Sequence, residues 1–185
     1  RSAGPVARHS STIAVSPDGA RVYVVNADAD SVSVIDTASR ALVREIALGT
    51  SPPAPDDAGR FEPRVQPRAL ALSPGARRLY VSGERSGDVS IVDLTIDRVV
   101  ARVTACSEPA GVLVAPDERT LFVACSNDGS LVRIDAARRA VTGRRPTSRH
   151  RDLCRWLRAS LLTYPRARPC CSPPQCLHAI LIPPF

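Results

Sequence analysis

The stretch RALALSPGARRLYVSGERSGDVSIVD (68–93) decides the fold, because two other segments of the chain repeat its pattern. They are STIAVSPDGARVYVVNADADSVSVID (11–36) and AGVLVAPDERTLFVACSNDGSLVRID (110–135). In each segment a proline precedes the final aspartate by 19 residues, and an aromatic residue occupies one shared position between them. The matched residues are Pro17, Pro74 and Pro116; Tyr23, Tyr80 and Phe122; and Asp36, Asp93 and Asp135. Fixed spacings of this kind indicate a repeat architecture.

Each repeat predicts four short strands, a to d in chain order. In the first repeat an apolar run at 13–15 precedes the turn at 17–19, where proline presets φ and glycine accepts a positive φ. The segment 22–25 is β-branched and aromatic, 31–34 alternates serine with valine, and 42–46 supplies a fourth strand. The repeats recur after 57 and then 42 residues. Four strands at such spacings are typical of a β-propeller blade.

The same residues resemble the YVTN-type β-propeller repeat family. The motifs that carry the resemblance are YVVN (23–26), LYVSG (79–83) and LFVAC (121–125). Each follows a Pro-Asp-Gly-like turn and precedes a strand similar to VSVID, so the resemblance covers about 10–143. It implies blades around a central channel in a bacterial or archaeal protein that is periplasmic, secreted or on the cell surface. It implies no single activity, because such propellers serve as scaffolds, binding modules or partners of redox domains.

We therefore predict an all-β fold of four-stranded antiparallel meanders, forming an incomplete ring or open arc with an irregular C-terminal tail. The blade units are 10–49, 67–106 and 109–143. The third is expected to be incomplete, because Arg145 occupies the position of Ile46 and Val103 in strand d. Propellers commonly close with four to eight blades, so three blades predict a fragment of a larger ring. Its open edges predict self-association.

The tail at 144–185 differs in composition from the repeats. It holds eight arginines and one acidic residue, whereas 1–143 holds 17 of each and is neutral, which argues against a nucleic-acid partner for the blades. The tail has seven prolines and no fourth repeat, so we predict a disordered or out-of-frame segment. The alternative is a basic amphipathic helix over 153–162 that rests on an anionic membrane. No apolar run reaches 18 residues, so no membrane span is predicted.

The cysteines predict no cofactor. Two lie in the repeats and four in the tail: Cys106, Cys125, Cys154, Cys170, Cys171 and Cys176. Their spacing matches neither a recognised zinc pattern nor the C-x-x-C-H of covalent haem attachment. They leave the redox compartment open.

The acidic stretch NADADS (26–31) could be a calcium-binding loop or a hairpin turn. A calcium loop needs a central glycine and a distal glutamate, and Ser31 and Thr37 occupy those positions. The equivalent positions hold Gly83, Arg85 and Gly87 in the second repeat and Cys125, Asn127 and Gly129 in the third. We therefore predict a hairpin turn, with a weak calcium site in the first repeat as the alternative. The repeated aspartates at the ends of strands c are expected to cap the turns that follow them.

Strands of a meander alternate in direction, so the connections between strands b and c and between strand d and the next strand a lie at the same end of the blades. This end is a candidate binding face. The connection between the first and second repeats has 15 extra residues, at about 52–68, and should lie beside the turns between strands b and c. Insertions on one face of a repeat array often mark a binding surface, and the alternative is a solvated spacer. The candidates for contacting an unknown protein or small ligand are Asp28, Asp30, Asp56, Asp57, Arg60, Phe61, Arg85 and Asn127.

No nucleophile–base pair supports an enzyme. His9, His150 and His178 lie outside the repeats, and no glycine-rich phosphate loop is present. The leading hypothesis is a non-catalytic binding or scaffold module. One alternative is an accessory of a c-type cytochrome or haem peroxidase whose haem domain lies outside this chain. Another is a lactonase-like hydrolase, which would need His, Glu or Arg on strands a, and those runs are apolar.

Overall fold

The computed structural model describes residues 12–49 and 62–147, and it contains three sheets of four strands within those ranges. The first sheet consists of β1 (Ile13–Val15), β2 (Arg21–Asn26), β3 (Ser31–Asp36) and β4 (Leu42–Ala47). The second consists of β5 (Pro67–Leu72), β6 (Arg78–Gly83), β7 (Asp88–Asp93) and β8 (Arg98–Thr104). The third consists of β9 (Pro109–Val114), β10 (Thr120–Cys125), β11 (Ser130–Asp135) and β12 (Ala140–Pro146).

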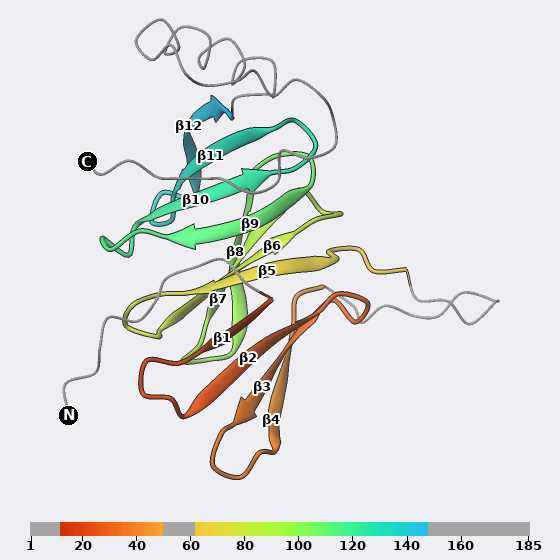
Figure 1. The fold of residues 1–185 in the computed structure, drawn as a ribbon, viewed down its shortest axis with the longest axis vertical. Helices are drawn as coiled ribbons and strands as arrows, with labels where there is room; N and C mark the ends of the chain where they lie inside the picture. The colour runs from red at the N-terminus through yellow and green to blue at the C-terminus, as the bar shows by residue number, and fades with distance from the viewer. Residues whose placement is uncertain (1–11, 50–61, 148–185) are drawn as a thin grey trace, which may run out of the picture. The chain divides into compact units, whose positions relative to one another are not determined.

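Every sheet is an antiparallel meander in which each strand pairs with the next along the chain (Figure 1). The predicted fold class is therefore confirmed: the described chain is all-β and consists of four-stranded propeller blades. Neither described range contains a helix of the length and apolarity needed to cross a membrane.

The turn between β1 and β2 forms because a serine and an aspartate satisfy the backbone locally. The Ser16 hydroxyl donates to Asp18, and the backbone N–H groups of Ala20 and Arg21 donate to these two side chains. Gly19 has a φ of 73°, the left-handed conformation that glycine adopts without steric cost. The short segment at 17–20 can therefore reverse the chain direction without unpaired polar groups.

The core lies between successive sheets and repeats the same positions. Tyr23 and Val32 of the first sheet share a buried cluster with Leu70, Leu79 and Val81 of the second. The equivalent residues of the second and third sheets form the next cluster: Tyr80, Val89, Val112, Leu121 and Val123. Tyr23 and Tyr80, at the shared aromatic position of the repeats, are buried in these two clusters, and Phe122 is partly buried.

The prediction that the third sheet is incomplete and ends at Gly143 is wrong. β12 pairs with β11 along its length, from Ala140 opposite Asp135 to Pro146 opposite Ser130. All seven β12 residues are exposed, so the strand is held by backbone hydrogen bonds and tolerates arginine where the other sheets have buried residues. The compact unit that contains the three sheets ends at Thr147. The predicted tail beyond it, including 153–162, lies outside the described residues.

The aspartates at the ends of β3, β7 and β11 cap the following turns, as predicted. Asp36 accepts a backbone N–H from Ser39, Asp93 accepts one from Thr95, and Asp135 accepts those of Ala137 and Arg138. Three carboxylates on three different sheets are thus occupied by their own turns, so they form a structural feature and not a catalytic group.

These caps predict a loss of stability in acid. The pKa of each carboxyl group is held below its ordinary value of about 3.8, chiefly by the backbone N–H of Ser39 at Asp36, by the Thr95 hydroxyl at Asp93 and by the N–H of Arg138 at Asp135. A depressed pKa stabilises the fold above the unfolded pKa, and that contribution is lost as the pH falls through the folded pKa. We expect the urea midpoint to be constant above about pH 5 and to fall below about pH 4.

The matched control is Asp93→Asn, which keeps an acceptor oxygen but cannot titrate. Its urea midpoint should depend less on pH between 5 and 3 than that of the wild type. An equally steep acid dependence in this variant would show that the Asp93 cap does not contribute to the effect.

Candidate functional site

The described end of the long connection, residues 62–66, lies against the b–c turn of the first sheet. The carboxylate of Asp30 accepts the backbone N–H groups of Arg64, Val65 and Gln66 at 2.6–3.1 Å. The Asp30 carbonyl also accepts the N–H of Leu48 at 2.7 Å. The predicted common face is confirmed for these residues; Pro67 and Arg68 begin β5, and residues 52–61 of the predicted insertion lie outside the described ranges.

Asp30 is therefore not a ligand-binding residue, which corrects its place among the candidates. Its side chain is only 2% exposed, and three backbone donors occupy its two oxygens. Asp30 has a φ of 49° and lies in the hairpin turn between β2 and β3. Asn26 at the end of β2 pairs with Ser31 at the start of β3, so the prediction of a hairpin turn is confirmed. Asp28 of the same turn is exposed.

Four other candidates lie outside the described residues: Asp56, Asp57, Arg60 and Phe61. The two remaining candidates, Arg85 and Asn127, lie on the b–c turns of the second and third sheets. Both are exposed. The structure thus keeps Asp28, Arg85 and Asn127 as accessible residues on this face.

The b–c turn of the second sheet packs closely on the long connection. The N–H of Glu84 donates to the carbonyl of Gln66, and those of Arg85 and Ser86 donate to the carbonyl of Val65. A Cβ at Gly83 would lie 2.8 Å from a methyl group of Val65, so only glycine fits where the two backbones meet. Arg85 also forms an ion pair with Glu62 at 3.7 Å.

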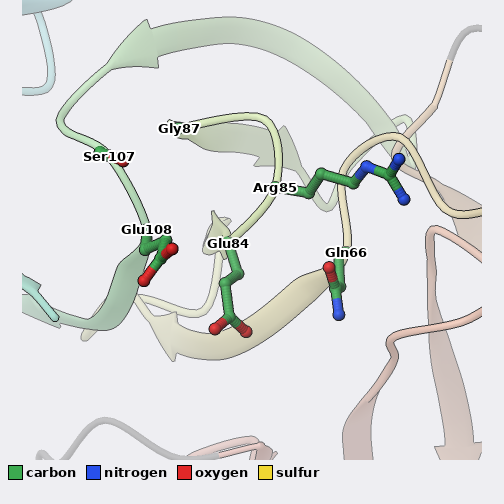
Figure 2. A pocket seen from close by; sticks show the side chains of 6 residues that line it. All are labelled: Gln66, Glu84, Arg85, Gly87, Ser107 and Glu108. Carbon is green, nitrogen blue, oxygen red and sulfur yellow. The ribbon is translucent and has the colours of Figure 1, made fainter. Parts of the chain in front are cut away.

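A cleft of about 440 Å³ opens on this face between the second and third sheets. Its lining residues are Gln66, Glu84, Arg85, Gly87, Ser107 and Glu108. Figure 2 shows that the side chains of Gln66, Glu84 and Glu108 extend to the same side, whereas Arg85 extends away from them. The Glu84 carboxylate forms an ion pair with Arg68 of β5. The cleft is therefore polar and carries acidic, basic and neutral groups.

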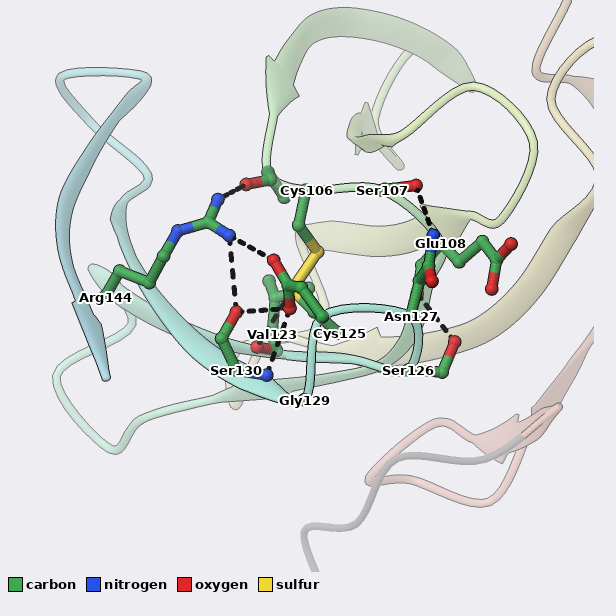
Figure 3. The surroundings of a disulfide bond; sticks show 12 residues. Cys106, Ser107, Glu108, Val123, Cys125, Ser126, Asn127, Gly129, Ser130 and Arg144 are labelled. Carbon is green, nitrogen blue, oxygen red and sulfur yellow. Dashed lines mark hydrogen bonds and ion pairs between the residues drawn. A yellow bond between two sulfur atoms is a disulfide. The ribbon is translucent and has the colours of Figure 1, made fainter. Parts of the chain in front are cut away.

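A disulfide between Cys106 and Cys125 fixes one wall of the cleft (Figure 3). Their Cα atoms are 6.2 Å apart, and 19 residues separate them in sequence. Sequence reasoning assigned no partner to either cysteine. The strand register could have predicted this bond. Cys125 ends β10 opposite Pro109, and Cys106 precedes Pro109 by three residues, so the two cysteines lie at the same end of the third sheet. The disulfide therefore joins the connection at 105–108 to the third sheet.

The other side of the same connection is held by the second sheet. The Gly87 carbonyl accepts the N–H groups of Ala105 and Cys106 at 2.9 and 3.2 Å. A Cβ at Gly87 would lie 2.9 Å from the Cys106 carbonyl oxygen, and the φ of Gly87 is 73°. Next to the disulfide, the side-chain amide of Asn127 donates to the Ser107 hydroxyl at 3.1 Å. The wall that carries Ser107 and Glu108 is thus preorganised.

Arg144 of β12 links the third sheet to the end of the second. Its guanidinium donates to the Ala105 carbonyl at 2.7 Å and forms an ion pair with Asp128 (Figure 3). The hydroxyl of Ser130 and then Arg144 lower the pKa of Asp128. Arg144 was assigned to the tail by composition, but the structure makes it a contact between blades.

Among residues 12–49 and 62–147, no group of three His, Cys, Asp or Glu side chains is placed to hold a metal ion. A lactonase-like site would need His, Glu or Arg on the first strand of each sheet. Among β1, β5 and β9 only Arg68 of β5 is of these types, and it forms an ion pair with Glu84. The site is best described as a rigid polar cleft.

No protein-family model matches the chain, and no curated protein matches it either. Among solved structures, hydrazine synthase of Kuenenia stuttgartiensis is similar, with a TM-score of 0.62 and 28% sequence identity. The similarity covers 74% of this chain and 35% of that chain. The present chain therefore spans about a third of the length of the enzyme chain that it matches.

Proposed function

We propose that the chain is a non-catalytic β-propeller module of the YVTN type that binds a protein partner in the cleft between its second and third blades. One observation carries this proposal: the cleft has rigid walls and exposed polar side chains. Its connection is bonded to Gly87 on one side and to Cys125 on the other. Preorganised walls favour binding, because little conformational entropy is lost when a partner docks.

A disulfide at this position also supports an extracytoplasmic location. Disulfides persist in the periplasm, on cell surfaces and in secreted proteins, whereas thiols stay reduced in the cytosol. Cys106 and Cys125 are both buried, at 8% and 4% exposure, so the bond is shielded from reductants. We therefore propose that the cleft belongs to a periplasmic, secreted or surface-exposed protein.

The test uses peptides selected on the full chain from a displayed random library. Reversing the charge of the exposed Glu108 by Glu108→Lys should weaken the selected peptides at least tenfold, because this side chain lies in the cleft. The control is Arg98→Glu, a charge reversal at the exposed start of β8, outside the cleft lining. Failure to select any peptide, or equal affinity for both variants, would count against the cleft as a binding site.

A second candidate is an accessory propeller within a larger redox enzyme, such as a c-type cytochrome or haem peroxidase. The similarity to a third of a hydrazine synthase chain favours it, because that match shows comparable sheets within a longer enzyme chain. The gene segments that flank this chain should then encode a C-x-x-C-H motif, and the parent protein should absorb near 400 nm. Flanking segments that contain only further repeats would favour the binding module.

A further inference from the structure

At the end opposite the cleft, an ion pair joins the first and second sheets. Arg44 of β4 forms a salt bridge with Asp97, which lies in the turn between β7 and β8. Asp97 has a φ of 52°, and this left-handed turn directs the chain back from β7 to β8. The carboxylate of one blade thus neutralises the guanidinium of its neighbour.

The same two positions differ between the second and third sheets. The repeat offsets of 57 and 42 residues make Ala101 the equivalent of Arg44, and Arg139 the equivalent of Asp97. Backbone conformation supports this alignment, because Arg40, Asp97 and Arg139 have φ values of 57°, 52° and 57° in equivalent turns. A cation therefore replaces the carboxylate, and a methyl group replaces the arginine that faced it.

A pocket of about 180 Å³ occupies this place. Its lining residues are Arg78, Ile91, Val100, Ala101, Ala136, Ala137 and Arg139. Two arginines thus border a small space whose other walls are aliphatic. Neither Arg78 nor Arg139 forms a salt bridge with any carboxylate in the described ranges.

The acidic residues near the pocket are engaged with other donors. Asp93 accepts both the N–H and the hydroxyl of Thr95, at 2.9 and 2.6 Å. Asp135 accepts two backbone N–H groups and pairs with Arg119 at 3.2 Å. Glu118 accepts the N–H of Gly75 at 2.8 Å. Asp93 lies opposite Arg78, and the hydrogen bonds from Thr95, and after them the charge of Arg78, lower its pKa, but no described carboxylate is within salt-bridge distance of Arg78 or Arg139.

The hydroxyl of Tyr80 lies beside Arg78, one of the residues that line the pocket. The side chain is fully buried, and its oxygen has no hydrogen-bond partner among the described residues. Burial raises the pKa of this hydroxyl, and the adjacent guanidinium of Arg78 lowers it. Arg78 therefore lies between the buried end of Tyr80 and the pocket.

We propose that this pocket binds a small oxyanion, a carboxylate or phosphate group, between Arg78 and Arg139. The anion takes the role that Asp97 plays between the first and second sheets. Carboxylate and phosphate oxygens match the planar donor fork of a guanidinium, and Arg78 and Arg139 are both exposed, so an anion from solution can reach them. A bound anion would also link the second and third blades. The site lies apart from the cleft, so it does not depend on the proposed function.

The direct test measures the ³¹P line width of inorganic phosphate, and the ¹³C line width of labelled acetate, titrated with the full chain at constant ionic strength. Wild type should broaden at least one of the two signals, and Arg139→Gln should reduce that broadening at least threefold. Arg40→Gln is the matched control, because it removes an arginine from the equivalent turn of the first sheet. Other arginines contribute the same background to all variants. Equal broadening by wild type and Arg139→Gln with both probes would overturn the proposal.

A second variant introduces the salt bridge of the first and second sheets at the equivalent place between the second and third sheets. The double substitution Ala101→Arg with Arg139→Asp restores the arginine–carboxylate pair of Arg44 and Asp97. If phosphate is the ligand that broadens, wild type should melt about 3 °C higher in 20 mM phosphate than in sodium chloride of equal ionic strength; acetate replaces phosphate if only acetate broadens. The rebuilt chain should not respond to the anion. A rebuilt chain that responds as strongly as wild type would show that the anion binds elsewhere.

Discussion

Removing the Cys106–Cys125 disulfide is expected to lower the free energy of unfolding by about 3 kcal/mol, because the bond closes a loop of 19 residues in the unfolded chain. The double variant Cys106→Ser, Cys125→Ser avoids an unpaired thiol and should show this loss in urea denaturation. The effect should extend to the cleft, because the disulfide holds the connection that carries Ser107 and Glu108. Selected peptides should therefore bind the double variant more weakly, even under conditions where it is folded.

Reduction provides the control for this prediction. Dithiothreitol should lower the wild-type urea midpoint to that of the double variant, and it should not change the double variant further. Cys154→Ser tests for a general effect of losing a thiol, because Cys154 follows β12 in the sequence and takes no part in the Cys106–Cys125 bond. A double variant as stable as the wild type would mean that the bond does not stabilise the native fold.

Replacing Asp30 should have a comparable or larger effect, of about 4 kcal/mol for Asp30→Ala. The buried carboxylate accepts three backbone N–H groups, and its loss leaves those donors without partners. Alanine also disfavours the φ of 49° at this position. The expected local signature is faster hydrogen exchange at the amides of residues 64–66, which the Asp30 side chain alone holds in this turn.

The Asp30→Asn variant separates the effect of the carboxylate charge on stability from the effect of the backbone conformation at this position. Asparagine tolerates a positive φ and keeps one acceptor oxygen, so it should lose about half as much stability as alanine. Asp28→Ala is the matched control, because Asp28 is an exposed aspartate of the same turn and should change stability by less than about 0.5 kcal/mol. If the Asp28 and Asp30 variants were equally stable, the carboxylate would not anchor the connection.

The sequence alone determined the strands and turns of this protein, because these depend on local physical chemistry. Alternating serine and valine set the faces of β3, proline and glycine set the turn at 17–19, and the fixed offsets set the number of blades. The turn interpretation of 26–31 and the caps at Asp36, Asp93 and Asp135 followed from short-range geometry in the same way.

The tertiary structure decided everything that depends on residues far apart in sequence. Asp30 resembled its exposed neighbour Asp28 until the fold brought residues 64–66, more than 30 positions later, onto its carboxylate. β12 formed although its side chains broke the pattern, because backbone hydrogen bonds to β11 do not depend on side-chain polarity. The disulfide between Cys106 and Cys125 forms where the second and third sheets meet. Arg44 forms a salt bridge with Asp97 of the next sheet, whereas the equivalent contact between the second and third sheets has Arg139 in place of the carboxylate. A repeat pattern specifies each sheet by itself, but the chemistry between sheets depends on which side chains the packed blades bring together.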